Sequence, residues 1–499
     1  MELAIKELPI DFYRQKNSET LYQEQTAEIM IPESLPEIRR IVDAFGNVVL
    51  QEKRMEGGEV RLSGGVQAGV VYVPEGDEDV QSMDAWLPFS FRKSTDVQDG
   101  CLIVRTWLKS IDARMVNSRK AIVRANIGVE LWQLAPEQVQ LASVIDAPKA
   151  LQMLQNSYPV LLPVACGEQE FRVQDELTLP DTGPAIERIL KWELTPTVEE
   201  SRMIGNKAVF QGDVVVQALF LGTDGSVNTY IGQLPYSQYV ELPGEWPDGS
   251  VVVFPTVTNA QIETDGQMES RTLLVDLNLL AQVCVFDQIV FALNEDAYAV
   301  GAALAPTWQQ INLQPILDAQ TIRENAELQA SCKAQRVVQT SVCVDQPVLR
   351  RNQDQVTAVA ALSGNLLYLD SDGQLQNKAL RGECACSTQM GENCRCRPHC
   401  RMEGAPELSI GAESVRIRLP LQFELQVVQD AQWQNLAGGE ITDTEADTKR
   451  PSVIVRPWRG GELWPLAKEL GTTVAEIESA NHITGTQAPE NEVLLIPMC

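Results

Sequence analysis

Two stretches of the chain, EIMIPESLPEIRRIVDAF at Glu28–Phe45 and ELTLPDTGPAIERILKWE at Glu176–Glu193, are versions of one segment. They lie 148 residues apart (176 minus 28), and a weaker third copy continues the series at Glu324 and Arg336. Self-similarity at a fixed period indicates an internal repeat. The residues that coincide in the first two copies are Glu28 and Glu176, Pro32 and Pro180, Ile38 and Ile186, and Arg40 and Arg188.

The same offset aligns three β-rich nonapeptides, each of which ends in a turn signal. They are GVVYVPEGD (Gly69–Asp77), QALFLGTDG (Gln217–Gly225) and NLLYLDSDG (Asn365–Gly373). A β-rich run before a turn that contains Asp and Gly is typical of the first arm of a β-hairpin. The sequence therefore predicts three tandem units, which we assign to residues 1–150, 151–305 and 306–437.

Each unit closes with a long run in which apolar and polar residues alternate. The first run spans Ala121 to Leu131, and Leu273 to Val283 and Val415 to Leu425 repeat it. Alternation over this length predicts antiparallel strands with one buried face. Helical patterns within the units are confined to short pieces, such as Leu35–Ala44 and Pro184–Lys191. The predicted fold class is mainly β, with three tandem antiparallel β-sandwich-like or barrel-like repeats.

The C-terminal part of the chain has a different character. Residues 438–451, GGEITDTEADTKRP, are polar, acidic and without periodicity, which is typical of a linker. Residues 452–499 predict a strand, two short helices and a strand, hence a small α+β (βααβ) domain. Pro465 falls in the first turn of the first helix, and Gly471 is placed to end that helix. Thr473 begins the second helix with a capping-box pattern.

This C-terminal segment resembles the LysM domain through GELWPLAKELGTTVAEIESAN (Gly461–Asn481) and VLLIP (Val493–Pro497). LysM domains bind N-acetylglucosamine-containing glycans between the loop that enters the first helix and the loop that leaves the second. The resemblance implies that ligand- or partner-binding residues lie in these loops: Gly460, Gly461, Glu462 and Leu463 in the first, and Asn481, His482, Ile483 and Thr484 in the second. Glu462 departs from the family's usual Asp-Thr, which alters the sugar-facing loop.

The same loop face could instead bind a protein. It would offer Trp458, Leu463, Trp464 and Ile483 beside Glu462, and interface hot spots are rich in tryptophan. Trp464 fits the core of the module equally well.

The three units resemble the SPOCS domain of spore coat proteins. The resemblance lies in Glu28–Glu52, in the hairpin segment VQAGVVYV (Val66–Val73), in LPFSF (Leu87–Phe91) and in the closing strand. Tandem SPOCS units followed by one LysM domain are the architecture of SipL-like spore coat morphogenesis proteins. The resemblance implies a non-enzymatic scaffold in the mother-cell cytoplasm, at the forespore surface. There it would bind the coat-morphogenetic ATPase and other coat proteins. The alternative is a peptidoglycan (GlcNAc)-binding protein that acts at the spore cortex or cell wall.

Composition narrows the range of partners. Lys and Arg number 40 and Asp and Glu 68, so the net charge is -28, which disfavours nucleic acid and anionic membrane surfaces. No window offers about 18 uninterrupted apolar residues, as a membrane span would need. The opening MELAIKELPIDFYRQKNSET does not read as a signal peptide, so we expect an intracellular protein. P-loop, HExxH and GxSxG motifs are missing from the sequence, which favours a binding protein over an enzyme.

Five of the eleven cysteines crowd into ECACSTQMGENCRCRPHC (Glu383–Cys400), beside His399. Residues two apart share one face of a strand, and GEN could turn the chain between two such strands. The resulting hairpin would present four thiols that suit a tetrahedral zinc site: Cys384, Cys386, Cys394 and Cys396. Oxidative cross-linking and a reduced, metal-free loop remain as alternatives. Other cysteines stand singly and are predicted to act as small buried hydrophobes, among them Cys101, Cys166 and Cys284.

Overall fold

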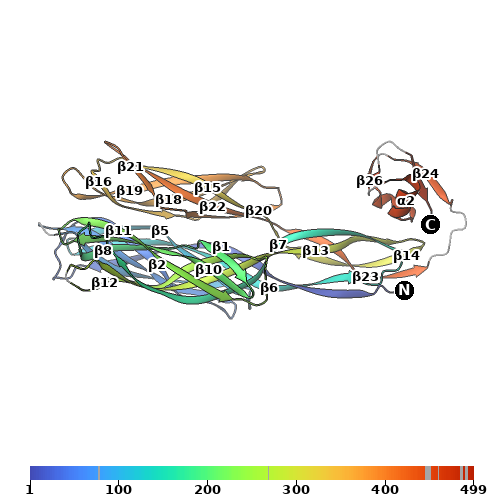
Figure 1. Cartoon of the computed structure of the whole chain (residues 1–499), viewed down its shortest axis with the longest axis horizontal. Helices are drawn as coiled ribbons and strands as arrows, with labels where there is room; N and C mark the ends of the chain where they lie inside the picture. Colours follow the sequence, from blue (N-terminus) through green and yellow to red (C-terminus); the bar gives the residue numbers. More distant parts are fainter. Residues whose placement is uncertain are drawn as a thin grey trace.

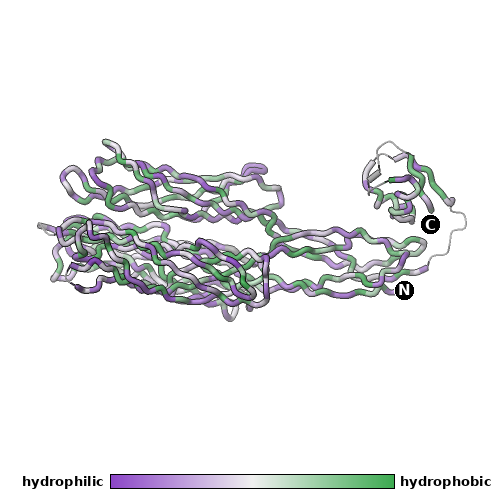
Figure 2. The backbone as a smooth tube through the Cα atoms, viewed as in Figure 1, coloured by the Kyte–Doolittle hydropathy of each residue, from purple (hydrophilic) through white to green (hydrophobic). Residues whose placement is uncertain are grey.

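The computed structural model describes residues 1–76, 79–267, 269–443, 451–458, 460–483, 487–488 and 493–498. The chain is mainly β, and the described residues form two short helices, both near the C-terminus. Neither of them has the length and apolar character that a bilayer-crossing helix needs. Figure 1 shows a broad body of packed strands, a narrower stalk and a small C-terminal module beside the end of the stalk. Hydrophobic and hydrophilic residues alternate along the strands of the body and the stalk (Figure 2).

In the first unit, two sheets enclose an apolar core. One sheet has the order β1-β6-β5 and the other the order β2-β3-β4. The alternate residues of β6 from Ala121 to Leu131 are at most 1% exposed, which confirms that the closing strand buries one face. The strands are β1 (Ile5–Met30), β2 (Ile38–Glu56), β3 (Glu59–Pro74), β4 (Gln81–Ser94), β5 (Cys101–Asn117) and β6 (Lys120–Val144).

The second unit repeats this order of strands. Its first and last strands, β7 and β13, pair along their length as β1 and β6 do, and β12 lies on the other side of β13. The facing sheet has the order β11-β10-β8, with β9 also paired to β10. The strands are β7 (Leu151–Thr178), β8 (Ile186–Pro196), β9 (Glu200–Ile204), β10 (Lys207–Gly222), β11 (Val227–Glu241), β12 (Ser250–Thr264) and β13 (Thr272–Ala299).

The long strands are interrupted in the third unit. β14 ends at Leu313 and β15 begins at Ile316, so the break contains Pro315, which has no N–H to donate to a sheet. Asp430 separates β22 from β23 at the same level. The strands are β14 (Ala302–Leu313), β15 (Ile316–Ala330), β16 (Arg336–Val344), β17 (Val348–Asn352), β18 (Gln355–Leu369), β19 (Leu375–Gln389), β20 (Cys394–Met402), β21 (Glu407–Ile410), β22 (Val415–Gln429) and β23 (Ala431–Asp443).

The predicted hairpins are present in all three units. β3 pairs antiparallel with β4, β10 with β11, and β18 with β19. In the second and third units the arms join through tight turns in which Gly225 and Gly373 have φ of 77° and 73°. Glycine adopts this left-handed conformation without a steric penalty, which is why the turn signal was readable from the sequence.

The two short helices predicted within the units are wrong. Most of Leu35–Ala44 and of Pro184–Lys191 belongs to strands β2 and β8. Each strand carries two register irregularities in this stretch. In β2 they lie between Ile38 and Arg40 and between Ile41 and Asp43. A β-bulge inserts an extra residue and shifts which side chains point inward. The apolar residues therefore recur every three or four positions, as they do in a helix.

The three units meet around a common apolar centre. Equivalent residues of consecutive units, 148 positions apart, line it together. Two such sets are Val42, Leu190 and Val338, and Val71, Leu219 and Leu367. This centre is separate from the three cores that lie within the units. Each unit thus contacts both of the others at the same place on its surface.

Hydrogen bonds close this arrangement into a ring. The arginine that coincides in the repeats reaches into a different unit each time. Arg40 Nη2 donates to Leu375 O (2.6 Å), Arg336 Nη2 donates to Val227 O (2.6 Å), and Arg188 donates to the side-chain oxygen of Gln81. The contacts run from the first unit to the third, from the third to the second and from the second to the first. A head-to-tail contact that returns to its start in this way is a closed ring.

Three two-stranded ribbons leave the body and form the stalk. They consist of residues 5–15 with 134–144, 151–163 with 286–299, and 302–313 with 431–443. The ribbons share an apolar core that includes Phe12, Phe291 and Ile311. Asn435 also joins them, because its side chain donates to Ala142 O (2.7 Å) and accepts from Asn294 N (2.9 Å). Residues 438–443, predicted to begin a linker, instead form the last part of β23 in this stalk.

The C-terminal module, residues 451–498 where described, has a short strand at each end. β24 (Val453–Pro457) pairs antiparallel with β27 (Val493–Pro497), and β25 (Gly461–Glu462) pairs with β26 (Gln487–Ala488). Between them lie α1 (Trp464–Leu470) and α2 (Val474–Asn481). The capping details follow the sequence: Gly471 ends α1 with φ of 64°, and Thr473 and Glu476 form the capping box of α2.

Candidate functional site

Two glycines with positive φ shape the first predicted binding loop of the C-terminal module. Gly460 and Gly461 have φ of 91° and 110°, conformations that side chains of other residues rarely allow. Glu462 is exposed, whereas Leu463 is completely buried in the core of the module. The backbone of this loop and the Glu462 carboxylate are therefore open to a partner, and the Leu463 side chain is not.

The second predicted loop begins at the end of α2. His482 ends the helix in the left-handed conformation, with φ of 55°, and is exposed. Asn481 has a structural role, because its side chain donates to Leu495 O (2.6 Å) and accepts from Leu495 N (2.7 Å). These bonds tie α2 to β27. Ile483 is half-buried against the module core, and Thr484 lies outside the described residues.

The two tryptophans of the predicted loop face have different surroundings. Trp458 packs on the module core, and its buried indole N–H has no acceptor among the described residues. Trp464, at the start of α1, points toward the stalk. Its indole N–H donates to Asp296 Oδ2 (2.8 Å), and its ring meets that of Tyr298 edge to face, with 5.0 Å between centroids. The Trp464 ring is therefore engaged within the chain itself.

One face of α1 docks on the end of β13 in the stalk. Lys468, one turn after Trp464, donates to Asp296 Oδ1 (2.5 Å), and Tyr298 Oη donates to Thr472 O (2.7 Å). Burial opposes ionisation of Asp296, but the Lys468 and Trp464 donors outweigh it and lower the pKa of this carboxyl. Tyr298 is only 7% exposed and belongs to the apolar core of the module. The docking leaves Gly461, Glu462 and His482 exposed.

The cysteine-rich segment does not form the predicted hairpin. β19 carries Cys384 and Cys386 and pairs with β18, whereas β20 carries Cys394 and Cys396 and pairs with β22. The two pairs of thiols thus come from facing sheets of the third unit. The sequence could not show this, because local spacing does not determine which neighbour a strand pairs with.

Most of these thiols lie in the core between the sheets. Cys384, Cys386, Cys396 and Cys400 are at most 9% exposed and belong to one apolar cluster, with Cys394 at its margin. Burial raises the pKa of Cys386 and of Cys396 to about 11. Over the part of the chain that the structure describes, no three His, Cys, Asp or Glu side chains converge as metal ligands would. Zinc binding by the four predicted cysteines stays a prediction, and it would need thiolates from both sheets.

His399 is separate from the thiols and faces the first unit. It contacts the guanidinium of Arg105, which is also paired with Glu130 (Nη1 to Oε2, 3.0 Å). Gln346 of the third unit donates to the same Glu130 carboxylate (2.8 Å). Burial, and then the positive charges of Arg105 and Arg401, lower the pKa of His399 well below 6.5. This cluster is an interface between units.

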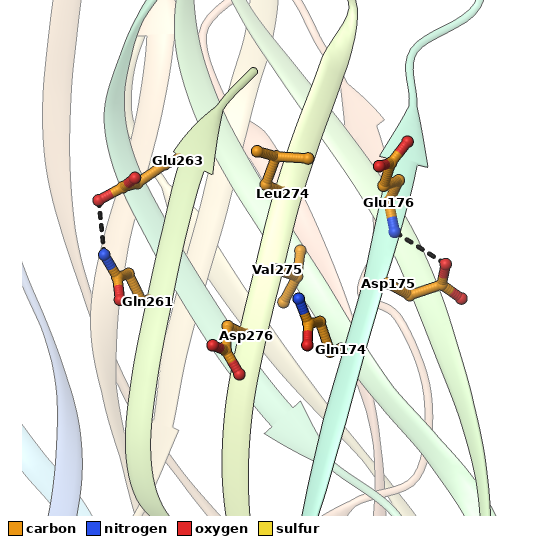
Figure 3. A pocket seen from close by; sticks show the side chains of 8 residues that line it. All are labelled: Gln174, Asp175, Glu176, Gln261, Glu263, Leu274, Val275 and Asp276. Carbon is orange, nitrogen blue, oxygen red and sulfur yellow. Dashed lines mark hydrogen bonds between the residues drawn. The ribbon is translucent and has the colours of Figure 1, made fainter. Parts of the chain in front are cut away.

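The surface of the second unit contains a shallow depression of about 670 Å³ (Figure 3). Asp276 is held there by Arg172 (Nε to Oδ1, 2.6 Å), and Gln261 donates to Glu263 (2.7 Å). Its ionisable lining side chains are all carboxylates. The lining residues are Gln174, Asp175, Glu176, Gln261, Glu263, Leu274, Val275 and Asp276.

Comparison with known proteins gives one match. A family model described as SipL, SPOCS domain, matches residues 185–265, which run from the start of β8 to the end of β12. The match supports a SipL-like family and a role connected with the spore coat. No curated protein and no solved structure matches the chain. The corresponding residues of the first unit, 148 positions earlier, run from β2 to the end of β5.

Proposed function

We propose that this chain is a non-enzymatic adaptor of endospore coat assembly, built from three SPOCS-type units and a C-terminal LysM-type module. The family match to residues 185–265 carries the proposal. The recurrence of the same strand order and the same inter-unit contacts 148 residues apart supports extending it to the other units. As in SipL-like proteins, the adaptor would act in the mother-cell cytoplasm, at the forespore surface.

The geometry of the stalk supports separate binding roles for the C-terminal module and for the body of this adaptor. The C-terminal module docks through one face of α1, which holds it at the end of a stalk of paired strands (Figure 1). Its two loops keep exposed positions at Gly461, Glu462 and His482. The module would bind the coat-morphogenetic ATPase through these loops, while the body of three units would contact other coat proteins.

A direct binding measurement tests the proposal. The full chain, immobilised, should retain the purified coat ATPase, and Glu462→Lys combined with His482→Glu should weaken retention at least tenfold. Glu469→Lys is the matched control, because Glu469 is an exposed residue of α1 outside both loops. Unchanged retention by the double variant, with an unchanged circular dichroism spectrum, would place the contact in the SPOCS-type units.

Peptidoglycan binding is the second candidate, because the exposed loops are those through which LysM domains hold acetamido sugars. The buried indole N–H of Trp458 beside the first loop is a donor for which the described residues supply no acceptor. Sedimentation with insoluble peptidoglycan distinguishes the two. Retention on peptidoglycan that depends on the loops, without binding to the ATPase, would favour the glycan.

A further inference from the structure

A buried amine and a buried carboxyl group are in direct contact where the first unit meets the second. Lys191 lies in β8, and its Nζ donates to Asp43 Oδ2 in β2 (2.9 Å). The two side chains are 1% and 0% exposed. The residues that precede them, Leu190 and Val42, belong to the apolar centre where the three units meet. The pair is therefore shielded from water.

Two amide donors act on the other oxygen of the same carboxyl group. Asn365 Nδ2 of the third unit donates to Asp43 Oδ1 (2.9 Å), and Asn377 Nδ2 donates to it over a longer distance (3.4 Å). The carboxyl group thus meets an amine at Oδ2 and amide donors at Oδ1. Donors fixed in this way stabilise the negative charge that develops on an oxygen when a nucleophile attacks its carbon.

A second carboxylate is placed to accept protons from the amine. Glu193 Oε1 lies 3.1 Å from Lys191 Nζ, and Glu193 Oε2 accepts from Ser341 Oγ (2.9 Å). Nζ also donates to Ser341 Oγ (2.8 Å). The side chain of Glu193 is 25% exposed, so it can exchange protons with water, which the buried Asp43 cannot. The group combines a nucleophile, an electrophilic carbon, donors for the developing charge and a base.

The amine is protonated at rest and has two carboxylates to which it can pass a proton. Burial lowers the pKa of Lys191, but the charges of Asp43 and Glu193 outweigh burial and raise it. Burial also raises the pKa of the Asp43 carboxyl, which favours the neutral acid. A proton that passes from Nζ to Oδ2 leaves a neutral amine beside a neutral acid. These are the reactants for amide formation.

We propose that Lys191 and Asp43 condense into an isopeptide bond that joins the second unit to the first. After the proton transfer, Nζ attacks Cγ of Asp43, and Asn365 and Asn377 stabilise the charge on Oδ1. Glu193 takes a second proton from Nζ and returns it to Oδ2. The Cγ–Oδ2 bond breaks and a water molecule leaves. Nζ keeps one proton as an amide N–H, Glu193 is again a carboxylate, and no electrons are transferred.

Burial favours the condensed form. Holding two charges away from water carries a large desolvation cost, and condensation replaces both charges by one neutral amide. Contact within the fold also replaces a bimolecular encounter by an intramolecular step, which accelerates the attack. The bond would join equivalent positions of two repeats, 148 residues apart (191 minus 43). It would hold the two units together even after their noncovalent contacts are lost.

Mass spectrometry of the purified full chain tests the proposal. The intact mass should be lower than the mass of the sequence by one water molecule. Trypsin does not cleave after a modified lysine, so the digest should contain Ile41–Lys53 linked to Ile189–Arg202. Lys207 and Glu241 are the internal control, because this exposed pair has a similar distance (3.1 Å) and should stay unlinked.

Three substitutions identify the reacting groups. Lys191→Arg should keep the full mass, because it removes the amine. Asp43→Asn should lose one ammonia instead of one water, since the amide nitrogen is then the leaving group. Glu193→Gln should slow the loss of water about a hundredfold, the scale of general acid–base catalysis. The intact mass at successive times after cell-free synthesis measures this rate.

An intact mass that stays equal to that of the sequence would overturn the proposal. Loss of water without the linked peptide, as succinimide formation would give, would overturn it too. Equal linking of Lys207 to Glu241 would show that burial is not the cause. An unchanged rate in Glu193→Gln would exclude Glu193 as the base. The wild-type chain decides the question even if a variant folds poorly.

Discussion

The indole of Trp107 in β5 covers the Cα of Gly128, its direct partner in β6. A Cβ added at Gly128 would lie 2.2 Å from Trp107 Cε2, well inside van der Waals contact. The same indole donates its N–H to Asp345 Oδ1 in the third unit (3.1 Å). The missing side chain at Gly128 thus makes room for a contact between the first unit and the third.

Gly128→Ala should displace Trp107 and weaken this contact. We expect the free energy of unfolding to fall by about 1–3 kcal/mol, the usual cost of overpacking a tight site. Gly183→Ala is the matched control, because nothing lies within 4 Å of the Cβ added there, and it should stay within about 0.5 kcal/mol. Guanidinium unfolding followed by tryptophan fluorescence measures both. Equal stability of the two variants would show that Trp107 can move freely.

Lys191→Met should be among the most destabilising single substitutions. Lys191 Nζ is 1% exposed and lies 2.9 Å from the Asp43 carboxylate of the first unit, which is fully buried. Removing the lysine leaves a buried carboxylate unpaired, at a cost of about 3–5 kcal/mol. Lys207→Met, which breaks the exposed pair with Glu241, should cost about 1 kcal/mol or less. If Asp43→Asn does not restore part of the loss in Lys191→Met, the pair is not its cause.

Stability should fall as the pH drops below 6.5, and His399 should account for part of the loss. Burial and Arg105 keep the pKa of folded His399 well below 6.5, so the unfolded chain binds a proton that the folded chain does not. The stabilisation is therefore complete above pH 6.5 and decreases as the pH falls toward the folded pKa. His399→Gln should flatten this part of the profile. Thermal unfolding between pH 5 and 8 compares the two chains, and identical slopes would contradict the assignment.

Asp296→Asn should loosen the C-terminal module from the stalk. It removes the charge that pairs with Lys468 and weakens the acceptor of the Trp464 N–H. We expect hydrogen exchange in Trp464–Leu470 to quicken about threefold to tenfold, in line with a loss of about 1 kcal/mol. Asp287→Asn, elsewhere on β13, should leave it unchanged. The module itself should stay folded, since Tyr298 and Val300 are the described stalk residues that pack in its core and the substitution changes neither.

The sequence predicted the parts of the fold that depend on local patterns. Alternation identified the closing strand β6, and turn residues identified the hairpins of β10 and β18. The same reasoning failed at Leu35–Ala44, where bulges imitate a helical period. It also failed at Cys384–Cys396, where the two strands pair with different neighbours. Both failures arise where tertiary pairing overrides local spacing.

The sequence patterns did not predict which residues of different parts of the chain contact one another. Trp464 was predicted on an open loop face or in the core of the module, and it binds Asp296, 168 residues earlier. Such pairs follow from how the units pack, which a period along the chain does not specify. A family resemblance singled out the loops around Glu462 and His482, and their role in binding stays a prediction.

Asp43, Lys191 and Gln339 occupy the same buried position in the three units. This position shows an advantage of three repeats in one chain over a trimer of three identical chains. These residues are equivalent in the repeats, 148 positions apart, and each is at most 3% exposed. A homotrimer would place three carboxylates or three ammonium groups at this position, and like charges would repel one another at close range. Duplication within one gene lets the three copies diverge separately, so an acid, a base and a neutral amide can share the position. Ring closure within one chain is then also independent of protein concentration.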